Sequence, residues 1–234
     1  MNYKVIFQGN FYPKNIHIHH TLPSFQTDEF IETQIKKNWH SLSRNDRPLF
    51  DGKNYRLEKF SILDSGDIKL GLSTISYKQT VGIPLEYVAM NGKEANFPLS
   101  LCCTILLQTQ CGNFLFGKRD SKHLLVGGSY SLEEVVLVNG KHIFDMPMLE
   151  LKQEVGLSRN HISSSVLKGG LITNKLNAAL LFHMKCNKTR EEIEEIFHRS
   201  HDQEFDEIVF VRVDELKEYF QINHPNKLEI LSIL

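Results

Sequence analysis

The sequence lacks long hydrophobic runs and any strong net charge, and each absence removes a class of protein. No segment approaches the roughly 18 apolar residues of a membrane-spanning helix, and the first ten residues hold no apolar stretch of signal-peptide length. Lys and Arg total 27 against 28 Asp and Glu, so no global field draws the chain to nucleic acid. We therefore expect a cytoplasmic protein without a membrane or nucleic-acid partner.

Cysteine is also scarce, and its placement argues against a fold held together by disulfide bonds. The four cysteines are Cys102, Cys103, Cys111 and Cys186. Their spacing matches neither a zinc site nor a disulfide framework, so we expect reduced thiols in a reducing compartment. The chain has no internal repeat or low-complexity segment. With 234 residues it is long enough for one full core and a smaller lobe.

The most informative stretch is an amphipathic helix expected over residues 145–155. Glu150 and Glu154 are four residues apart, so on a helix they share one face and can point at the same ion. Apolar residues at three- and four-residue spacing would bury the other side. Gly156 suits the left-handed position just beyond a helix end. A glutamate pair alone more often marks a solvated face than a metal site.

The residues before this helix strengthen the metal interpretation. Residues 101–107 and 114–116 read as a β-hairpin that turns at Gly112-Asn113 and ends in the basic Arg119. The double glycine Gly127-Gly128 follows as a loop, where glycines permit close backbone approach to a ligand. A strand, a glycine loop and an acidic helix thus follow one another along the chain.

This succession resembles the core of the Nudix hydrolases. Their box runs Gly, five residues, Glu, seven residues, then Arg-Glu-apolar-any-Glu-Glu-any-Gly-apolar. Gly128 and Glu134 fit its front, and its back is matched by Glu150, Leu151, Glu154, Gly156 and Leu157. The chain departs from the box at Leu149, where the family has arginine, and at Gln153, where it has the first glutamate of the pair.

A third departure is the spacing, because fourteen residues separate Glu134 from Leu149 where the box has seven. Residues 135–144 look like an insertion, and its Asn139-Gly140 pair favours a small hairpin. We expect only the second part of the box helix to survive this insertion.

Two earlier segments are similar to the animal UDP-glucose/UDP-galactose pyrophosphatases within this superfamily. These are residues 48–57, with Leu-Phe-Asp and Tyr-Arg-Leu, and residues 70–77, with Leu-Gly-Leu and a final tyrosine. The resemblance, which covers about residue 25 to the end, implies substrate contacts from Arg56, Tyr77, Arg119 and Asn174. Each also has a structural alternative: Arg56 as a strand ion-pair partner, for example, and Tyr77 as a filler between lobe and core.

The element pattern predicts an α/β fold, a Nudix-like α/β/α sandwich with a smaller amino-terminal α+β lobe. We expect the lobe over residues 1–96 and the hydrolase core over residues 97–234. The lobe holds an early strand near residues 3–8, strands at 55–63 and 68–76, and a helix at 28–40 that Thr27 can cap. Late elements of the core are a helix at 189–198, a strand at 207–213, and helices near 215–220 and 226–233.

The function that the resemblance implies is Mg²⁺-dependent hydrolysis of a UDP-sugar to UMP and a sugar 1-phosphate. Glu150 and Glu154 would be the catalytic carboxylates and, with the Gly127 carbonyl, the ligands of Mg²⁺ or, as an alternative, Mn²⁺. Gln153 can offer the ion only a neutral oxygen, so Gln153→Glu should tighten metal binding. Two alternatives stay open: hydrolysis of another nucleoside diphosphate derivative such as ADP-ribose, and a decayed protein that binds a nucleotide sugar without cleaving it. The sequence does not determine the oligomeric state.

Overall fold

The molecule is built around a twisted seven-stranded mixed sheet. The computed structural model describes residues 3–22, 27–42, 49–83, 100–173, 177–200 and 204–234. Within these residues the strand order is β1-β8-β9-β5-β6-β10, and β7 pairs with β6 beside this path. Only the β5–β9 pair is parallel. The strands are β1 (Lys4–Phe11), β5 (Leu101–Gln108), β6 (Phe114–Arg119), β7 (Lys122–Leu124), β8 (Ile162–Ile172), β9 (Ala178–Cys186) and β10 (Glu207–Val211).

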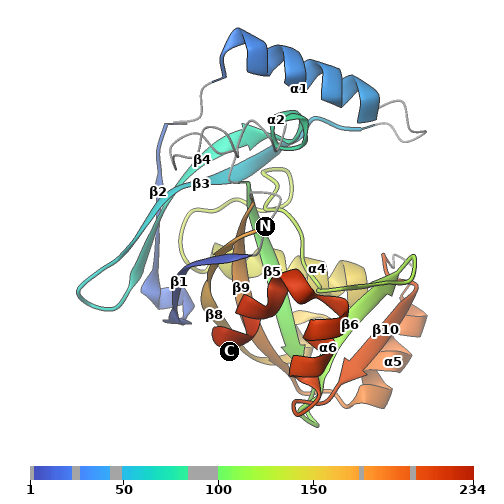
Figure 1. Cartoon of the computed structure of the whole chain (residues 1–234). Helices are drawn as coiled ribbons and strands as arrows, with labels where there is room; N and C mark the ends of the chain where they lie inside the picture. The colour runs from blue at the N-terminus through green and yellow to red at the C-terminus, as the bar shows by residue number, and fades with distance from the viewer. Residues whose placement is uncertain (1–2, 23–26, 43–48, 84–99, 174–176, 201–203) are drawn as a thin grey trace.

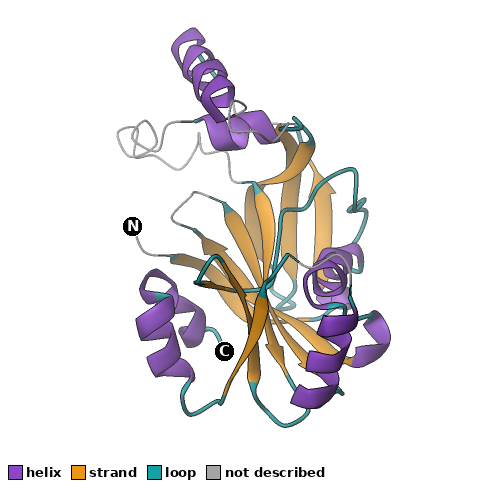
Figure 2. Cartoon of the chain, turned by 90° about the vertical axis from the view of Figure 1, so that its right-hand side faces the viewer, coloured by secondary structure: helices purple, strands orange, loops and turns teal. Residues whose placement is uncertain are grey.

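Helices cover both faces of this sheet, as Figures 1 and 2 show. On one face lie α4 (Asp145–Glu150), a helical turn over Leu151–Val155 and α5 (Arg190–Arg199). On the other lie α6 (Leu216–Asn223) and a 3-10 helix over Pro225–Ser232. The expected α/β sandwich is therefore confirmed. No helix in the described part of the chain is long and apolar enough to cross a membrane.

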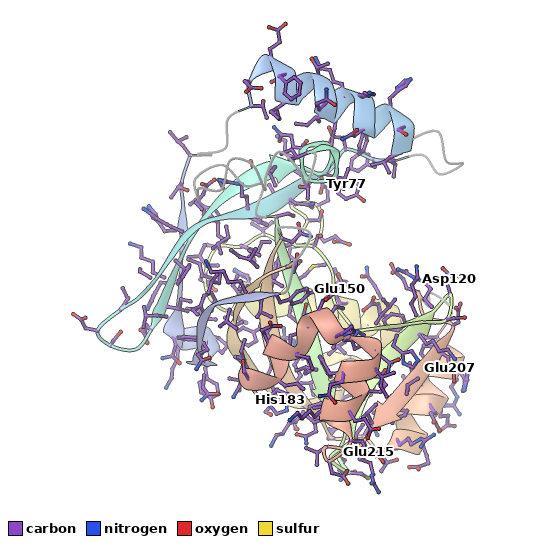
Figure 3. The ribbon with its side chains drawn as sticks, viewed as in Figure 1. Tyr77, Asp120, Glu150, His183, Glu207 and Glu215 are labelled. Atoms are coloured by element: carbon purple, nitrogen blue, oxygen red, sulfur yellow. The ribbon has the colours of Figure 1, made fainter. Side chains whose placement is uncertain are left out.

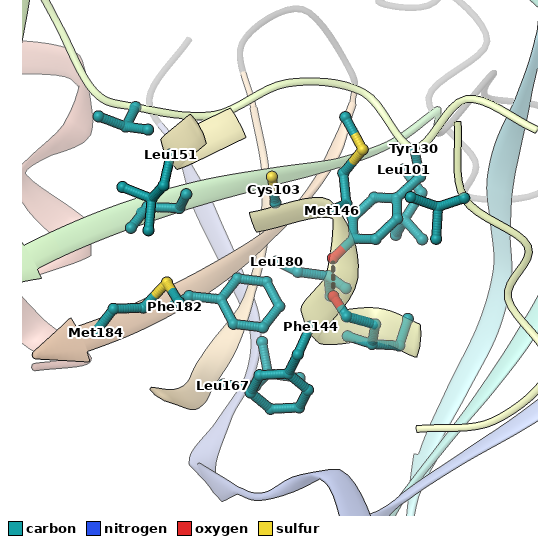
Figure 4. Packing of buried hydrophobic residues seen from close by; sticks show 14 of the residues in the cluster. Leu101, Cys103, Tyr130, Phe144, Met146, Leu151, Leu167, Leu180, Phe182 and Met184 are labelled. Atoms are coloured by element: carbon teal, nitrogen blue, oxygen red, sulfur yellow. Dashed lines mark hydrogen bonds between the residues drawn. The ribbon is translucent and has the colours of Figure 1, made fainter. Parts of the chain in front are cut away.

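Alternation along β5 explains why the sheet is buried on both sides. Leu101, Cys103, Ile105 and Leu107 point into the cluster beneath α4, whereas Leu106 points toward α6. Figure 4 shows the α4 side of this core, where the buried Tyr130 hydroxyl donates to the Ile143 carbonyl at 2.6 Å. A buried phenol needs such a partner, because an unpaired polar group in the core is costly.

A smaller lobe stands beside the main sheet. It contains a three-stranded sheet in the order β2 (Ile16–His20), β4 (Ile68–Ser76), β3 (Lys53–Ile62), together with α1 (Glu29–Leu42) and α2 (Tyr77–Gly82). The lobe sheet packs directly on the core, because Tyr55, Leu57 and Leu70 belong to the same buried cluster as Leu101. The boundary between the two expected domains falls in residues 84–99, outside the described residues, so that division stays a prediction.

Three local expectations need correction. The early strand does not belong to the lobe, because β1 pairs with β8 in the main sheet. The carboxylate of Asp28, and not Thr27, caps α1 by accepting from the Ile31 amide at 2.8 Å. Residues 135–144 form no hairpin. Leu137 is fully buried and its amide donates to the Tyr55 hydroxyl. The segment is irregular and ends in a 3-10 turn, His142–Phe144.

Candidate functional site

The acidic helix expected from the sequence is present, but it changes its winding between the two glutamates. The α-helical hydrogen bonding of α4 ends at Glu150, and Leu151–Val155 form one wider turn of π-helix. Such turns are rare and often occur at functional sites. Gly156 ends the segment in the left-handed conformation, with φ of 83°, as its position predicted. The expectation of one α-helix over residues 145–155 is therefore wrong in detail, although the segment is helical throughout.

Glu150 and Glu154 both point inward, toward the glycine loop. Their exposed fractions are only 9% and 5%. The Gly127 amide donates to Oε2 of Glu154 at 2.9 Å, which fixes that carboxylate beside the loop. Gly128 leaves room for the other carboxylate, because a Cβ at Gly128 would overlap Oε1 of Glu150. The glycines thus permit the approach that the sequence suggested.

Burial makes this carboxylate pair electrostatically unusual. Desolvation, with smaller contributions from the negative charges of Glu134 and Glu204, raises the pKa of Glu150 from 4.5 to about 7. The pKa of Glu154 rises to about 8, again mainly through desolvation, although the hydrogen bond from Gly127 opposes the shift. Perturbed carboxyl groups of this kind cluster at functional sites, because a cation or a proton is needed to balance them.

Three further charged groups surround the pair. The negative charges of Glu134 and Glu204 raise the pKa of Glu150, and the positive charge of Arg119 opposes the rise in the pKa of Glu154. Arg119 also forms an ion pair with Glu204 at 3.0 Å, with both side chains about half exposed or more. Sequence reasoning missed Glu204 as a site residue. No sequence signal placed it there, because its approach follows from the pairing of β10 with β6.

The two irregular box positions lie on another side of the same helical segment. Leu149 and Gln153 line a groove against α5, together with Lys152 and Arg199. Gln153 is exposed, in contrast to Glu150 and Glu154. This placement does not support the expectation that Gln153 reaches the same ion.

Arg56 and Tyr77, two further residues expected to contact the substrate, have structural partners in the lobe. Arg56 is 3% exposed and forms an ion pair with Glu58 within β3, which corresponds to its structural alternative. Tyr77 begins α2, and its ring lies edge-to-face with Trp39 of α1. Figure 3 places Tyr77 on the lobe, well apart from Glu150. Asn174 lies outside the described residues. A substrate role for these residues stays a prediction.

The oxygen atoms at this site suit a hard divalent cation, although few side chains supply them. Among the described residues no group of three or more His, Cys, Asp or Glu side chains could hold a metal ion. Burial nevertheless makes ionisation of Glu150 and Glu154 unfavourable, and a bound cation would offset that cost by stabilising the ionised form. The Gly128 carbonyl already accepts from the Cys103 amide at 2.8 Å, whereas no described donor bonds the Gly127 carbonyl. Carboxylate and carbonyl oxygens are the ligands that Mg²⁺ prefers.

Comparison with known proteins gives structural similarity only. No protein-family model and no curated protein sequence matches the chain. Among solved structures, Tm1382, a candidate Nudix hydrolase, has a TM-score of 0.48 and 11% identity, over 83% of this chain and 94% of the other. A Nudix hydrolase from Nitrosomonas europaea has a TM-score of 0.40 and 15% identity, over 57% and 86%. RenU, a Nudix hydrolase from M. smegmatis, has 0.35 and 13%, over 51% and 74%. At these values the similarity carries no argument about residues or reaction.

Proposed function

We propose that this chain is a Nudix-type hydrolase that splits the diphosphate of a UDP-sugar into UMP and a sugar 1-phosphate. The observation that carries the proposal is the pair of buried carboxylates, Glu150 and Glu154, held against the glycine loop. The UDP-sugar part rests on the resemblance of residues 48–57 and 70–77 to the animal UDP-sugar pyrophosphatases.

In this proposal the cation is Mg²⁺, held by Glu150, Glu154 and the carbonyl of Gly127. Bound Mg²⁺ would neutralise charge on the diphosphate and lower the pKa of a coordinated water. Arg119 supplies positive charge at the rim, where it can contact a phosphate once it leaves Glu204. Burial raises the pKa of Glu150 to about 7 and that of Glu154 to about 8 in the metal-free chain, and bound Mg²⁺ would lower both values because it stabilises the ionised carboxylates.

The test is incubation of the purified chain with UDP-glucose and Mg²⁺, followed by chromatographic detection of UMP. Glu154→Gln keeps the shape of the side chain and removes its charge, so it should abolish release of UMP. Glu218→Gln, which makes the same change on the exposed side of α6, is the matched control and should retain activity. No UMP at high enzyme concentration would reject the proposal, and a clear preference for ADP-ribose would reject the UDP-sugar assignment.

A binding protein without turnover is the second candidate function. It is favoured by Leu149, which cannot orient a neighbouring carboxylate as the box arginine does, and by the small number of ligand side chains among the described residues. Calorimetry that finds micromolar binding of UDP-glucose, with no turnover in Mg²⁺ or Mn²⁺, would support it. Turnover that depends on Glu154 would reject it.

A further inference from the structure

A cavity lies on the sheet face that α6 covers, away from the carboxylate pair. Its volume is about 620 Å³, within the roughly 300–1,000 Å³ typical of small-molecule sites. Apolar side chains make up much of its lining, and a few polar groups project among them. The residues that matter here are Phe114, Leu216 and Leu231 on the apolar side, and Gln108, His183 and Lys217 on the polar side.

The strand register separates this cavity from the candidate active site. Gln108 and His183 follow the alternation of Leu106, so they point toward α6, whereas Cys103 points toward α4. Cys103 contacts the glycine loop, and Gln108 lies five positions farther along β5, a distance of about 17 Å along a strand. In Figure 3, His183 lies farther from the lobe than Glu150 does. The two sites therefore occupy opposite faces of the sheet.

The hydrogen bonds of His183 define which of its nitrogens is available. Nε2 lies 3.3 Å from Oε1 of Gln108, and the Gln108 amide nitrogen donates to the Gly112 carbonyl at 3.2 Å. Because an amide oxygen can only accept, Nε2 must carry the hydrogen. Nδ1 is then an acceptor in the neutral ring, and no described residue donates to it. Burial and the charges of Lys185 and Lys168 lower the pKa of His183, which favours this neutral form.

The cavity also carries positive charge. Lys217 lies on the exposed side of α6, and no described carboxylate forms an ion pair with it. Phe114 and His183 are adjacent rings on the floor, 6.0 Å apart between centroids, and present a surface on which a flat ligand can lie. The lining thus combines an apolar floor, the acceptor nitrogen of His183, the cation of Lys217, and the polar side chains of Gln221 and Ser232.

We propose that this cavity binds a small amphipathic anion with an aromatic body, an N–H or O–H group that donates to Nδ1 of His183, and an anionic group that contacts Lys217. This ligand is distinct from the substrate of the proposed function, and the site does not depend on Glu150 or Glu154. It is a separate binding activity on the opposite face of the sheet.

The probe is 1-anilinonaphthalene-8-sulfonate, which has two aromatic groups, one N–H donor and one sulfonate. We expect saturable binding of one molecule per chain, measured by fluorescence titration and calorimetry. Lys217→Glu should weaken binding about tenfold, because it replaces an attractive charge with a repulsive one. His183→Phe keeps the ring and removes the acceptor, and should weaken binding about fivefold. Lys36→Glu, the same charge reversal on the exposed side of α1, is the matched control.

Nitrogen-15 spectra of the histidines test the chemistry independently of affinity. We expect His183 protonated at Nε2 without the probe, and a shift of its Nδ1 resonance when the probe binds. Equal affinity in the wild type, Lys217→Glu and His183→Phe, or binding of many probe molecules without saturation, would overturn the proposal. Light scattering that shows a dimer which the probe dissociates would also overturn it, because the cavity would then be an interface between copies of the chain.

Discussion

Replacement of Glu150 by glutamine should stabilise the metal-free protein by an amount that grows as pH rises from about 4.5 to 7 and is complete above that window. Glu150 is 9% exposed and its pKa rises from 4.5 to about 7 through burial. Because the folded pKa lies above the unfolded one, the folded chain binds more protons between these two values. The free energy of unfolding therefore falls as pH rises from about 4.5 to 7, and the loss is complete above that window.

The magnitude follows from the shift itself. One pKa unit corresponds to 1.36 kcal/mol, so ionisation of Glu150 costs the folded state about 3 kcal/mol at pH 8. Glutamine has nearly the same shape and cannot ionise, so Glu150→Gln should remove this cost. For a chain of this length that corresponds to a Tm increase of about 6–12 °C at pH 8 and about 2–3 °C at pH 5.

The assay is thermal unfolding in a chelating buffer from pH 5 to pH 8.5, followed by circular dichroism. Glu218→Gln, at an exposed position on α6, should follow the wild-type curve at every pH. Adding Mg²⁺ at pH 8 should raise the Tm of the wild type more than that of Glu150→Gln, because the cation balances the same charge. If Glu150→Gln and the wild type have parallel pH profiles, Glu150 ionises normally in the folded chain and the burial argument fails.

Three further variants test the site and the core. Gly128→Ala should remove most of the Mg²⁺-dependent stabilisation measured by thermal unfolding, because the added Cβ would occupy the place of Oε1 of Glu150. Gln153→Glu should leave the Mg²⁺-dependent shift in Tm unchanged, since residue 153 lines the groove against α5; a larger shift would mean that it reaches the ion. Tyr130→Phe should lower the free energy of unfolding in urea by about 1–3 kcal/mol, because the Ile143 carbonyl loses its buried donor, and no change would refute that account.

Patterns with a clear period predicted the fold well. The β-hairpin of β5 and β6 pairs Leu107 with Leu115 across the turn expected at Gly112-Asn113, and Gly156 has the left-handed backbone expected after a helix. Thr189 caps α5 by accepting from the Glu192 amide, within the helix that the acidic residues 191–195 indicated. Each of these features depends on neighbours in the sequence, which is why local reasoning reached them.

Features that depend on distant residues were missed. Residues 135–144 carry a good turn signal at Asn139-Gly140, yet within the described residues they form no strand pair, and the Leu137 amide donates to the Tyr55 hydroxyl instead. The assignment of β1 to the main sheet depends on β8, which is more than 150 residues away. Glu204 could not be placed near Glu150 from spacing alone, because the approach follows from the pairing of β10 with β6.

The π-helical turn over Leu151–Val155 determines which side chains of the acidic segment can contact a cation. A uniform α-helix places residues 150 and 154 about 40° apart around its axis, whereas a wider turn alters this relation and shifts the residues between them. Here Glu150 and Glu154 both remain buried against the glycine loop, while Gln153 is exposed beside α5. A carboxylate at position 153 would therefore lie outside the buried pair, and its absence need not weaken the first cation site. A glutamine at position 153 is thus compatible with the proposed hydrolysis, provided that Glu150 and Glu154 hold the cation together.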